Sequence, residues 1–426
     1  MVYDNSSWDV ARTHPASWPQ ERPFGVTRAD FSDSLQMSLT GFRMKYFCWI
    51  AGEDFGGCQD YALTMARHLH SCGWKVEVIC IDEGLAEEFQ RRLANPEIVV
   101  HCQSVANWGL SKMLRGRGNN LIEFFFWLKF LRNHKADVLH EAIPWPSQAL
   151  PVILACACLG YPTLGTFQLV TEYVPRKRVG FSYRLAAWLG ARFCAVSENN
   201  RMLLRKHYGL KEPDVAVIFN RAAKDNFELP GMVERKQVRE KLGLSEKSRM
   251  ILSVGRLNHQ KGHDLIVRGI REIRQAFPEA VFVWAGEGEL RADLTRMAEE
   301  NGVRDHIVML GHRKDIRGLL AASDLFLFPS RWEGESFALT EAAIAETPIV
   351  ASNASGIPEL LRDGRDAWLF KVDDQAGLVR AVCAALSDPE EAARRAKSAK
   401  QRINAYTQED MFRDTIQLLE KTAARK

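Results

Sequence analysis

Short apolar runs rich in β-branched and aromatic residues alternate with stretches of helical periodicity along most of the chain. Strands are predicted in the first half at 45–50, 75–81, 137–140, 162–167 and 192–196, and in the second half at 250–254, 280–285, 306–310, 325–328, 348–352 and 367–372. Helical patterns fill the gaps, beginning with 58–72 and 85–93. This alternation predicts parallel sheets that are covered by helices on both faces.

The alternation is interrupted between residues 211 and 244, where Pro213, Pro230 and Gly231 stand among charged residues. A domain linker is therefore predicted there, with an α/β half of similar size on each side. The length of 426 residues also favours two domains, because a single hydrophobic core rarely grows so large. Ligands of such sheets bind at the carboxyl ends of the strands, so two facing sheets would place the active site in the cleft between them.

The composition is that of a globular protein, with 46% hydrophobic and 26% charged residues. The longest apolar run, 150–159, falls well short of the ~18 residues that a membrane-spanning helix needs. Residues 1–42 are polar and rich in Pro and Ser, without the apolar block of a signal peptide, so we expect an extension outside the fold. Nine cysteines without a CxxC pair indicate free thiols in a reducing cytoplasm.

The net charge of +4 hides an asymmetry, because residues 105–210 hold 14 Lys or Arg against 5 Asp or Glu. Within this span, basic residues stand beside aromatic ones in two segments, 112–132 and 176–188. This pattern suits the surface of an anionic membrane. Helices that cover the sheet, with Lys and Arg snorkelling outward, would give the same pattern. The aromatic residues form no RNA-binding motif, so nucleic acid is not expected as a partner.

The first residues with recognisable chemistry lie between the predicted strand 250–254 and the helix that follows it. Gly255, Arg256, Lys261 and Gly262 share one loop at the expected ligand edge of the sheet. Two cations there suit a diphosphate, whose negative charge grows as a glycosidic bond breaks. The glycines would let the backbone bend tightly. A solvated basic turn is the alternative interpretation.

A second group follows the predicted strand 325–328. Glu333 lies in the loop, and Glu341 falls in the first turns of the next helix. A carboxylate can accept hydrogen bonds from two neighbouring ribose hydroxyls, as it does in dinucleotide sites. The second carboxylate could hold sugar hydroxyls or offset a cationic transition state. The alternative is that both glutamates only complement the N-terminal end of a helix.

Together these groups carry a family resemblance. The C-terminal half resembles the retaining, family-four glycosyltransferases, which have two facing Rossmann-like domains in the GT-B fold. The matching segments occur in the family's order and with roughly its spacing: 253–257 with 261–262, 285–288, 310–311, 328–330, the pair Glu333 and Glu341, and 356–359. The resemblance implies an acceptor-side domain at 43–211, completed by a crossing helix within 405–426, and a sugar-nucleotide-binding domain at 212–404.

The resemblance also implies roles for the matching residues. Arg256 and Lys261 would grip the donor diphosphate, and Glu341 would hold the ribose. Glu333 would contact the transferred sugar. Backbone N–H groups of Gly334 and its neighbours, Glu335 and Ser336, would also reach the donor.

The N-terminal half resembles the family more loosely. Gly56 and Gly57 follow the first strand and open a helix, where a glycine-rich loop can approach phosphate or sugar closely. An ordinary turn would look the same. His140 ends a predicted strand toward the cleft and could contact the sugar or the acceptor, although a lone histidine is as often structural.

Several positions depart from the family. Gln168 stands where many relatives have a histidine, and Gln408 replaces the final tryptophan of the crossing helix. Glu335 and Ser336 replace the usual aromatic residue and glycine of the carboxylate motif, which alters the expected pocket for the donor sugar. Glu346 stands where a helix-ending glycine is common. None of these changes removes the phosphate or ribose contacts.

The sequence has no Asp-x-Asp motif, so a metal ion and a resident cofactor are not expected. The expected activity is transfer of a hexosyl group from a UDP- or GDP-linked sugar to a hydroxyl of a glycan or lipid-linked acceptor. The expected setting is the cytoplasm, at the inner face of the membrane. A sugar-nucleotide epimerase of related fold and a non-catalytic nucleotide-sugar-binding subunit are the alternatives.

Overall fold

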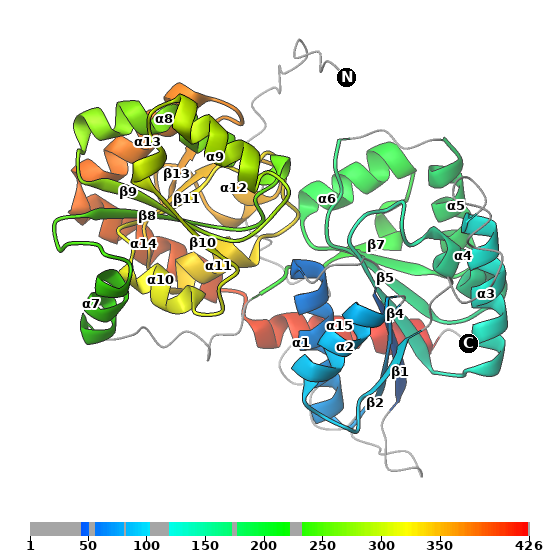
Figure 1. Ribbon diagram of the computed structural model, residues 1–426. Helices are drawn as coiled ribbons and strands as arrows, with labels where there is room; N and C mark the ends of the chain where they lie inside the picture. Colours follow the sequence, from blue (N-terminus) through cyan, green and yellow to red (C-terminus); the bar gives the residue numbers. More distant parts are fainter. Residues whose placement is uncertain are drawn as a thin grey trace.

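The computed structural model describes residues 44–50, 56–80, 82–102, 119–172, 177–221 and 232–424. Two α/β domains lie side by side, each built on its own sheet (Figure 1). The predicted extension 1–42 lies outside the described residues, as do the basic residues Lys112, Arg115 and Arg117. The predicted fold class, two Rossmann-like domains with parallel sheets, is confirmed.

Within the described residues, the first sheet has seven parallel strands in the order β3-β2-β1-β4-β5-β6-β7. Their bounds are β1 Lys45–Ile50, β2 Lys75–Cys80, β3 Val99–Cys102, β4 Val138–Ile143, β5 Thr163–Phe167, β6 Arg192–Ala195 and β7 Val215–Val217. The strands β3 and β7 were not predicted, because β3 is a half-exposed edge strand and β7 has only three residues inside the apparent linker. The strand predicted at 137–140 begins at Val138 and extends to Ile143, because Glu141, Ala142 and Ile143 continue the pairing with β5.

Helices cover both faces of this sheet. On one face, α1 (Gly57–Ser71) and α2 (Glu83–Leu93) share a hydrophobic core with α15 (Gln408–Ala423). On the other face lie α3 (Asn119–Asn133), α4 (Leu150–Cys158) and α5 (Lys177–Trp188), followed by α6 (Glu198–Leu203) with its continuation Leu204–Tyr208. The helices predicted at 58–72 and 85–93 are confirmed to within two residues.

The second sheet has six parallel strands among the described residues, in the order β10-β9-β8-β11-β12-β13. Their bounds are β8 Arg249–Val254, β9 Ala280–Ala285, β10 Ile307–Gly311, β11 Leu325–Phe328, β12 Ile349–Ser352 and β13 Trp368–Phe370. On one face pack α8 (His263–Ala276), α9 (Arg291–Glu300) and α13 (Gln375–Ser387). On the other face pack α7 (Met232–Lys241), α10 (Ile316–Ala322), α11 (Phe337–Ile344), α12 (Ile357–Leu360) and α14 (Pro389–Asn404).

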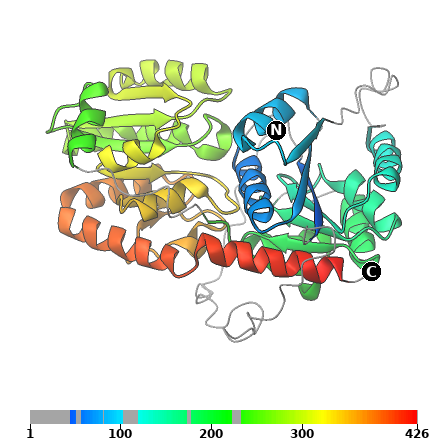
Figure 2. The ribbon, with the colours of Figure 1, turned by 90° about the horizontal axis from the view of Figure 1, so that it is seen from below.

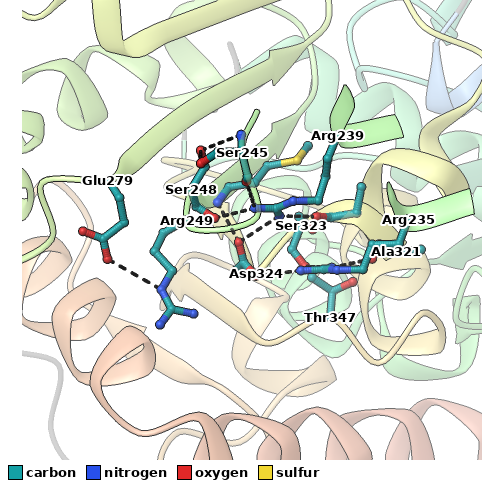
Figure 3. A network of polar contacts seen from close by, with 12 residues as sticks. Arg235, Arg239, Ser245, Ser248, Arg249, Glu279, Ala321, Ser323, Asp324 and Thr347 are labelled. Atoms are coloured by element: carbon teal, nitrogen blue, oxygen red, sulfur yellow. Dashed lines mark hydrogen bonds and ion pairs between the residues drawn. The ribbon is translucent and has the colours of Figure 1, made fainter. Parts of the chain in front are cut away.

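A polar network fastens α7 to the end of the second sheet where β8 and β11 begin (Figure 3). The carboxylate of Asp324 accepts hydrogen bonds from Arg235 at 2.7 Å, from Arg239 at 3.2 Å and from the backbone N–H of Met250 at 2.7 Å. Arg239 is buried and also donates to the carbonyl of Ala322. Since this network lies at the opposite end from the strands' carboxyl ends, its role is to hold α7 in place.

Counted between the described elements, the chain crosses from one domain to the other twice. The first crossing follows β7, and the second lies between α14 and α15, which run in succession along the lower side of the molecule (Figure 2). The α15 side chains Met411, Phe412, Leu418 and Leu419 pack into the core of the first domain. The last helix of the chain therefore completes the domain that contains the first strand.

Candidate active site

The order of strands reverses between β1 and β4 in the first sheet and between β8 and β11 in the second. At such switch points the connections leave in opposite directions, and ligands bind there at the carboxyl ends of the strands. The predicted residues lie at these points: Gly56 and Gly57 come after β1, Arg256 after β8 and Glu333 after β11.

The structure brings residues of the two domains into contact at these points. A Cβ atom added to Gly56 would lie 2.7 Å from Nη2 of Arg256, and one added to Gly57 would lie 3.7 Å from Cδ2 of Phe337. The N-terminus of α1 therefore packs against the loop after β8 and against the first residue of α11. Glycine at position 56 leaves the room that the guanidinium occupies.

Lys261 and Glu333 form an ion pair at the centre of this region. The Nζ atom of Lys261 lies 2.7 Å from Oε1 of Glu333, and 4.7 Å from the ring centroid of Phe328. Glu333 is buried. Gly262 has a φ of 68°, and a side chain there would overlap the carbonyl oxygen of Pro329, so this turn requires glycine. The tight turn is what directs Lys261 toward the loop that contains Glu333.

Glu341 lies one turn after Phe337 on α11, on the face that meets α1. Burial, together with the negative charge of Asp60 on α1, raises the pKa of its carboxyl to about 7. A carboxylate with this pKa accepts hydrogen bonds readily when ionised, and a ligand that donates two hydroxyls to it would favour the ionised form. The ribose contact of Glu341 stays a prediction.

The loop between Glu333 and α11 packs tightly against the first domain. A side chain at Gly334 would overlap the carbonyl oxygen of Gln168. Glu335 faces away from Lys261: its Oε2 accepts from the N–H of Asn220 and its Oε1 from Nη1 of Arg221. The hydroxyl of Ser336 caps α11 by accepting from the N–H of Leu339. The side chains of Glu335 and Ser336, both predicted near the donor, are thus engaged by the protein itself.

His140 lies apart from this group, in the middle of β4. Its Nδ1 lies 2.9 Å from the hydroxyl of Tyr46 and its Nε2 lies 2.8 Å from Oγ1 of Thr166. The ring is 1% exposed, and burial lowers its pKa to about 3. A neutral imidazole with both nitrogens hydrogen-bonded is suited to holding β1, β4 and β5 together, and the structure shows no contact of His140 with the other predicted residues.

Sequence reasoning assigned no role to three residues that join the domains, namely Asn220, Arg221 and Glu359. The carboxylate of Glu359 accepts from the N–H groups of Glu198 at 2.8 Å and Asn199 at 2.7 Å, and so caps α6 of the first domain. A signal for Glu359 existed, because it ends a segment that matches the family. No local signal marks Arg221, whose partner Glu335 lies 114 residues away.

The described residues hold neither a membrane-spanning helix nor a cluster of metal ligands. Among the helices there, none is both long and apolar enough to span a bilayer. In the same part of the chain, no three His, Cys, Asp or Glu side chains gather as they would around a metal ion. The lack of a metal requirement stays a prediction, to be tested by chelation.

Two family models match the chain side by side. Residues 55–220 match the model described as Glycosyltransferase Family 4, and residues 234–402 match the model described as Glycosyl transferases group 1. The boundary between the two matches falls between the two sheets, and together they span most of the chain.

Among curated proteins, the chain is 27% identical over 273 residues to the UDP-Gal:alpha-D-GlcNAc-diphosphoundecaprenol alpha-1,3-galactosyltransferase of Escherichia coli, covering 61% of this chain and 69% of that protein. It is 29% identical over 168 residues to the GDP-mannose-dependent alpha-(1-6)-phosphatidylinositol monomannoside mannosyltransferase of Mycolicibacterium smegmatis, covering 37% of this chain and 44% of the relative. The match to the second relative thus spans less than half of its length.

Among solved structures, HepE of Anabaena in complex with UDP and glucose superposes with a TM-score of 0.76 at 16% sequence identity, covering 89% of this chain and 100% of that one. This likeness extends over both domains and shows the shared fold. The two family matches, with the two facing parallel sheets, show that the chain belongs to the family-four glycosyltransferases of the GT-B fold.

Proposed function

We propose that the protein transfers a hexosyl group, with retention of configuration and without a metal ion, from a nucleoside diphosphate sugar to a hydroxyl of a glycan or lipid-linked acceptor. The observation that carries the proposal is the Lys261–Glu333 ion pair, with Arg256 and Glu341 nearby, where the two domains meet. The E. coli and M. smegmatis relatives, which are named for transfer to lipid-linked acceptors, support this acceptor class.

In this proposal, the second domain holds the donor. Arg256 and Lys261 neutralise the diphosphate, and they stabilise the charge that grows on it as the bond to the anomeric carbon breaks. Glu341 accepts hydrogen bonds from the ribose hydroxyls, and Glu333 contacts the transferred sugar. The N-terminal ends of α1 and α11, which approach each other here, add positive potential for the same charge.

The proposed reaction needs no carboxylate nucleophile. The bond between the anomeric carbon and the diphosphate oxygen breaks, and the acceptor oxygen forms its bond to that carbon from the same face. The acceptor's proton passes to the leaving diphosphate oxygen, so charge and atoms balance. Glu333 keeps its counter-ion Lys261 in this scheme and stabilises positive charge on the sugar. Close packing of the two domains would exclude water and so limit hydrolysis of the donor.

A binding and turnover screen tests this function. The protein is incubated with UDP-, GDP- and ADP-linked hexoses and with lipid extracts, and products are identified by mass spectrometry. We expect one donor to yield a glycosylated lipid or glycan that keeps the donor's anomeric configuration. Conversion of the donor to an isomer without any acceptor would instead establish an epimerase. Nucleotide binding without any turnover would indicate a binding subunit.

We further propose that α3 and α5 rest on an anionic bilayer. Large apolar side chains are exposed on both helices: Leu121 and Phe125 on α3, and Phe181 and Trp188 on α5, the last 80% exposed. Exposed cations share these helices: Lys129, Arg132, Arg178 and Arg184. This combination supports insertion of apolar side chains into an interface whose lipid headgroups pair with the cations.

Co-sedimentation with vesicles tests the surface. Vesicles containing phosphatidylglycerol should retain the protein, and vesicles of phosphatidylcholine alone should not. The variant Phe181→Ser/Trp188→Ser should lose binding, whereas Val372→Ser, which removes an exposed apolar side chain from the second domain, should keep it. Equal binding by both variants would show that the membrane contact lies elsewhere.

A further inference from the structure

The carboxylate of Glu335 and the guanidinium of Arg221 are the most deeply buried ion pair that joins the two domains within the described part of the chain. Each side chain is 1% exposed. Glu335 belongs to the loop 333–336, defined here as the donor loop, and Arg221 is the last described residue before the chain crosses into the second domain. The pair therefore links the proposed donor site to a chain crossing.

Arg221 also contacts the second crossing. Its Nε donates to the carbonyl of Tyr406 at 3.1 Å, and its guanidinium carbon lies 5.3 Å from the centroid of the Tyr406 ring. The side chain of Gln408 donates back to the carbonyl of Arg221 at 3.0 Å. Since Tyr406 lies between α14 and α15, one guanidinium contacts both segments through which the domains are connected.

The surrounding contacts fix the donor loop in the same place. The N–H of Asn220 donates to Oε2 of Glu335, and the side-chain amide of Asn220 donates to Oε1 of Gln168 at 2.7 Å. Gly334 packs on the carbonyl of the same glutamine. Glu333, which pairs with Lys261, thus directly precedes two residues, Gly334 and Glu335, that are packed on or bonded to the first domain.

We infer that Arg221 and Glu335 form a latch that fixes the donor loop against both chain crossings, so that Glu335 is a positioning residue rather than a contact to the donor. Both carboxylate oxygens are already used, one by Arg221 and one by Asn220. The latch sets where Glu333 stands relative to Lys261 when the domains are together. The effect of the latch on turnover rests on the proposed glycosyl transfer, whereas its effect on the position of the donor loop does not.

Hydrogen–deuterium exchange of the full-length protein tests the latch without any substrate. In Glu335→Gln the amide can accept at only one end, so either Arg221 or Asn220 faces an N–H₂ group. We expect loss of protection at the amide of Asn220 and in peptides spanning 330–340. The matched control is Glu359→Gln, which affects the other interdomain carboxylate and should lose protection at 198–199 while 330–340 stays protected.

A second variant separates positioning from simple stability. Removing one member of a buried ion pair destabilises a fold, whereas replacing both members by apolar residues of similar size often restores stability. Arg221→Met/Glu335→Met should therefore recover the thermal midpoint of the wild type. The double variant should still lack hydrogen-exchange protection at 330–340. Its turnover should lie about 10²-fold below that of the wild type, as for small misplacements of reacting groups. Affinity for UDP and GDP should stay unchanged in the same variant.

Two outcomes would overturn the latch. One is an unchanged exchange pattern at 330–340 in Glu335→Gln. The other is wild-type turnover in the double methionine variant, which would make the pair purely structural. If the wild-type protein turns over no sugar nucleotide, the proposed function fails, while the exchange experiment still decides whether Glu335 holds the loop.

Discussion

The ammonium group of Lys261, in the loop after β8, lies 2.7 Å from the carboxylate of Glu333, in the loop after β11. These loops leave adjacent strands at the switch point of the second sheet, so two groups 72 residues apart in the sequence become neighbours. The pair places a cation and an anion next to each other. A diphosphate would give Lys261 a second anionic partner.

The first prediction concerns the cations that face the diphosphate. Replacing Lys261 or Arg256 by Ala should lower kcat/KM for the sugar nucleotide by roughly 10²–10³-fold, the effect of losing one group that stabilises transition-state charge. Initial rates with the donor found in the screen measure it. Arg313→Ala, which removes an exposed arginine paired with Asp315 in the same domain, is the control and should retain wild-type rates. Unchanged kinetics in both site variants would show that neither cation stabilises the diphosphate.

The second prediction concerns metal ions. Because Arg256 and Lys261 can supply the positive charge, dialysis against EDTA should leave turnover nearly unchanged. Rates are compared before and after chelation, and again after addition of Mg²⁺ or Mn²⁺. Complete loss of activity that either ion restores would show that the diphosphate is neutralised by a metal.

The architecture could be predicted from the sequence because the pattern that marks each strand lies within a few neighbouring residues. Each predicted strand of the second domain is a short apolar run bounded by turn residues, and its bounds are correct to within about two residues. The edge strand β3 was missed because it has only four residues, Val99–Cys102, none of which is fully buried, so it lacks the longer apolar run of an inner strand. The short strand β7 was missed because prolines and charges on both sides resemble a linker.

The candidate site was less accessible from sequence, because its details depend on contacts between distant residues. Lys261 and Glu333 could be named from their loops, and the structure pairs them. The substitution at Glu335 was visible as a departure from the family, but the buried partner Arg221 was not, since nothing near either residue indicates the other. His140 was assigned toward the cleft from its place at a strand end, whereas the strand continues for three more residues and buries the ring.

The third prediction concerns His140. Since burial lowers its pKa to about 3, the ring stays neutral at the pH of any ordinary assay. His140→Gln should cost roughly 1–3 kcal/mol of unfolding free energy, because it disturbs the hydrogen bonds to Tyr46 and Thr166. Urea unfolding measures this loss. The pH profile of turnover should keep its shape, and disappearance of an acidic limb in the variant would restore a catalytic role for the histidine.

The lowered pKa of His140 also makes the free energy of unfolding depend on pH. A histidine whose pKa is lower in the folded state than in the unfolded state contributes stability above pH ~6.5, and this contribution is lost as the pH falls from there toward 3. His140→Gln should therefore show a shallower acid loss of stability than the wild type. His263, whose pKa is also lowered to about 3 by burial, titrates in both proteins and cancels in the comparison.

The fourth prediction separates the two glutamates of the proposed donor site by their positions. Glu341 is on α11 and should hold the ribose, which free UDP or GDP also contains. Glu341→Gln should therefore weaken nucleoside diphosphate binding by about 1.5–3 kcal/mol, the value of a charge-assisted hydrogen bond. Glu333→Gln should leave that affinity nearly unchanged and lower turnover, because its proposed contact is the sugar. Calorimetry with UDP and GDP measures both affinities.

The pH dependence of binding makes the distinction sharper. Burial raises the pKa of Glu341 to about 7, and the ribose hydroxyls donate to the ionised form, so binding should strengthen as the pH rises from 6 to 8. A group with that pKa is about one-tenth ionised at pH 6 and about nine-tenths at pH 8, which predicts a gain in affinity of roughly tenfold. Any titration of the ligand's own phosphate contributes equally to both variants. The increase of nucleoside diphosphate affinity with pH should therefore remain larger in Glu333→Gln than in Glu341→Gln. Equal increases in the two variants would mean that Glu341 does not contact the nucleotide.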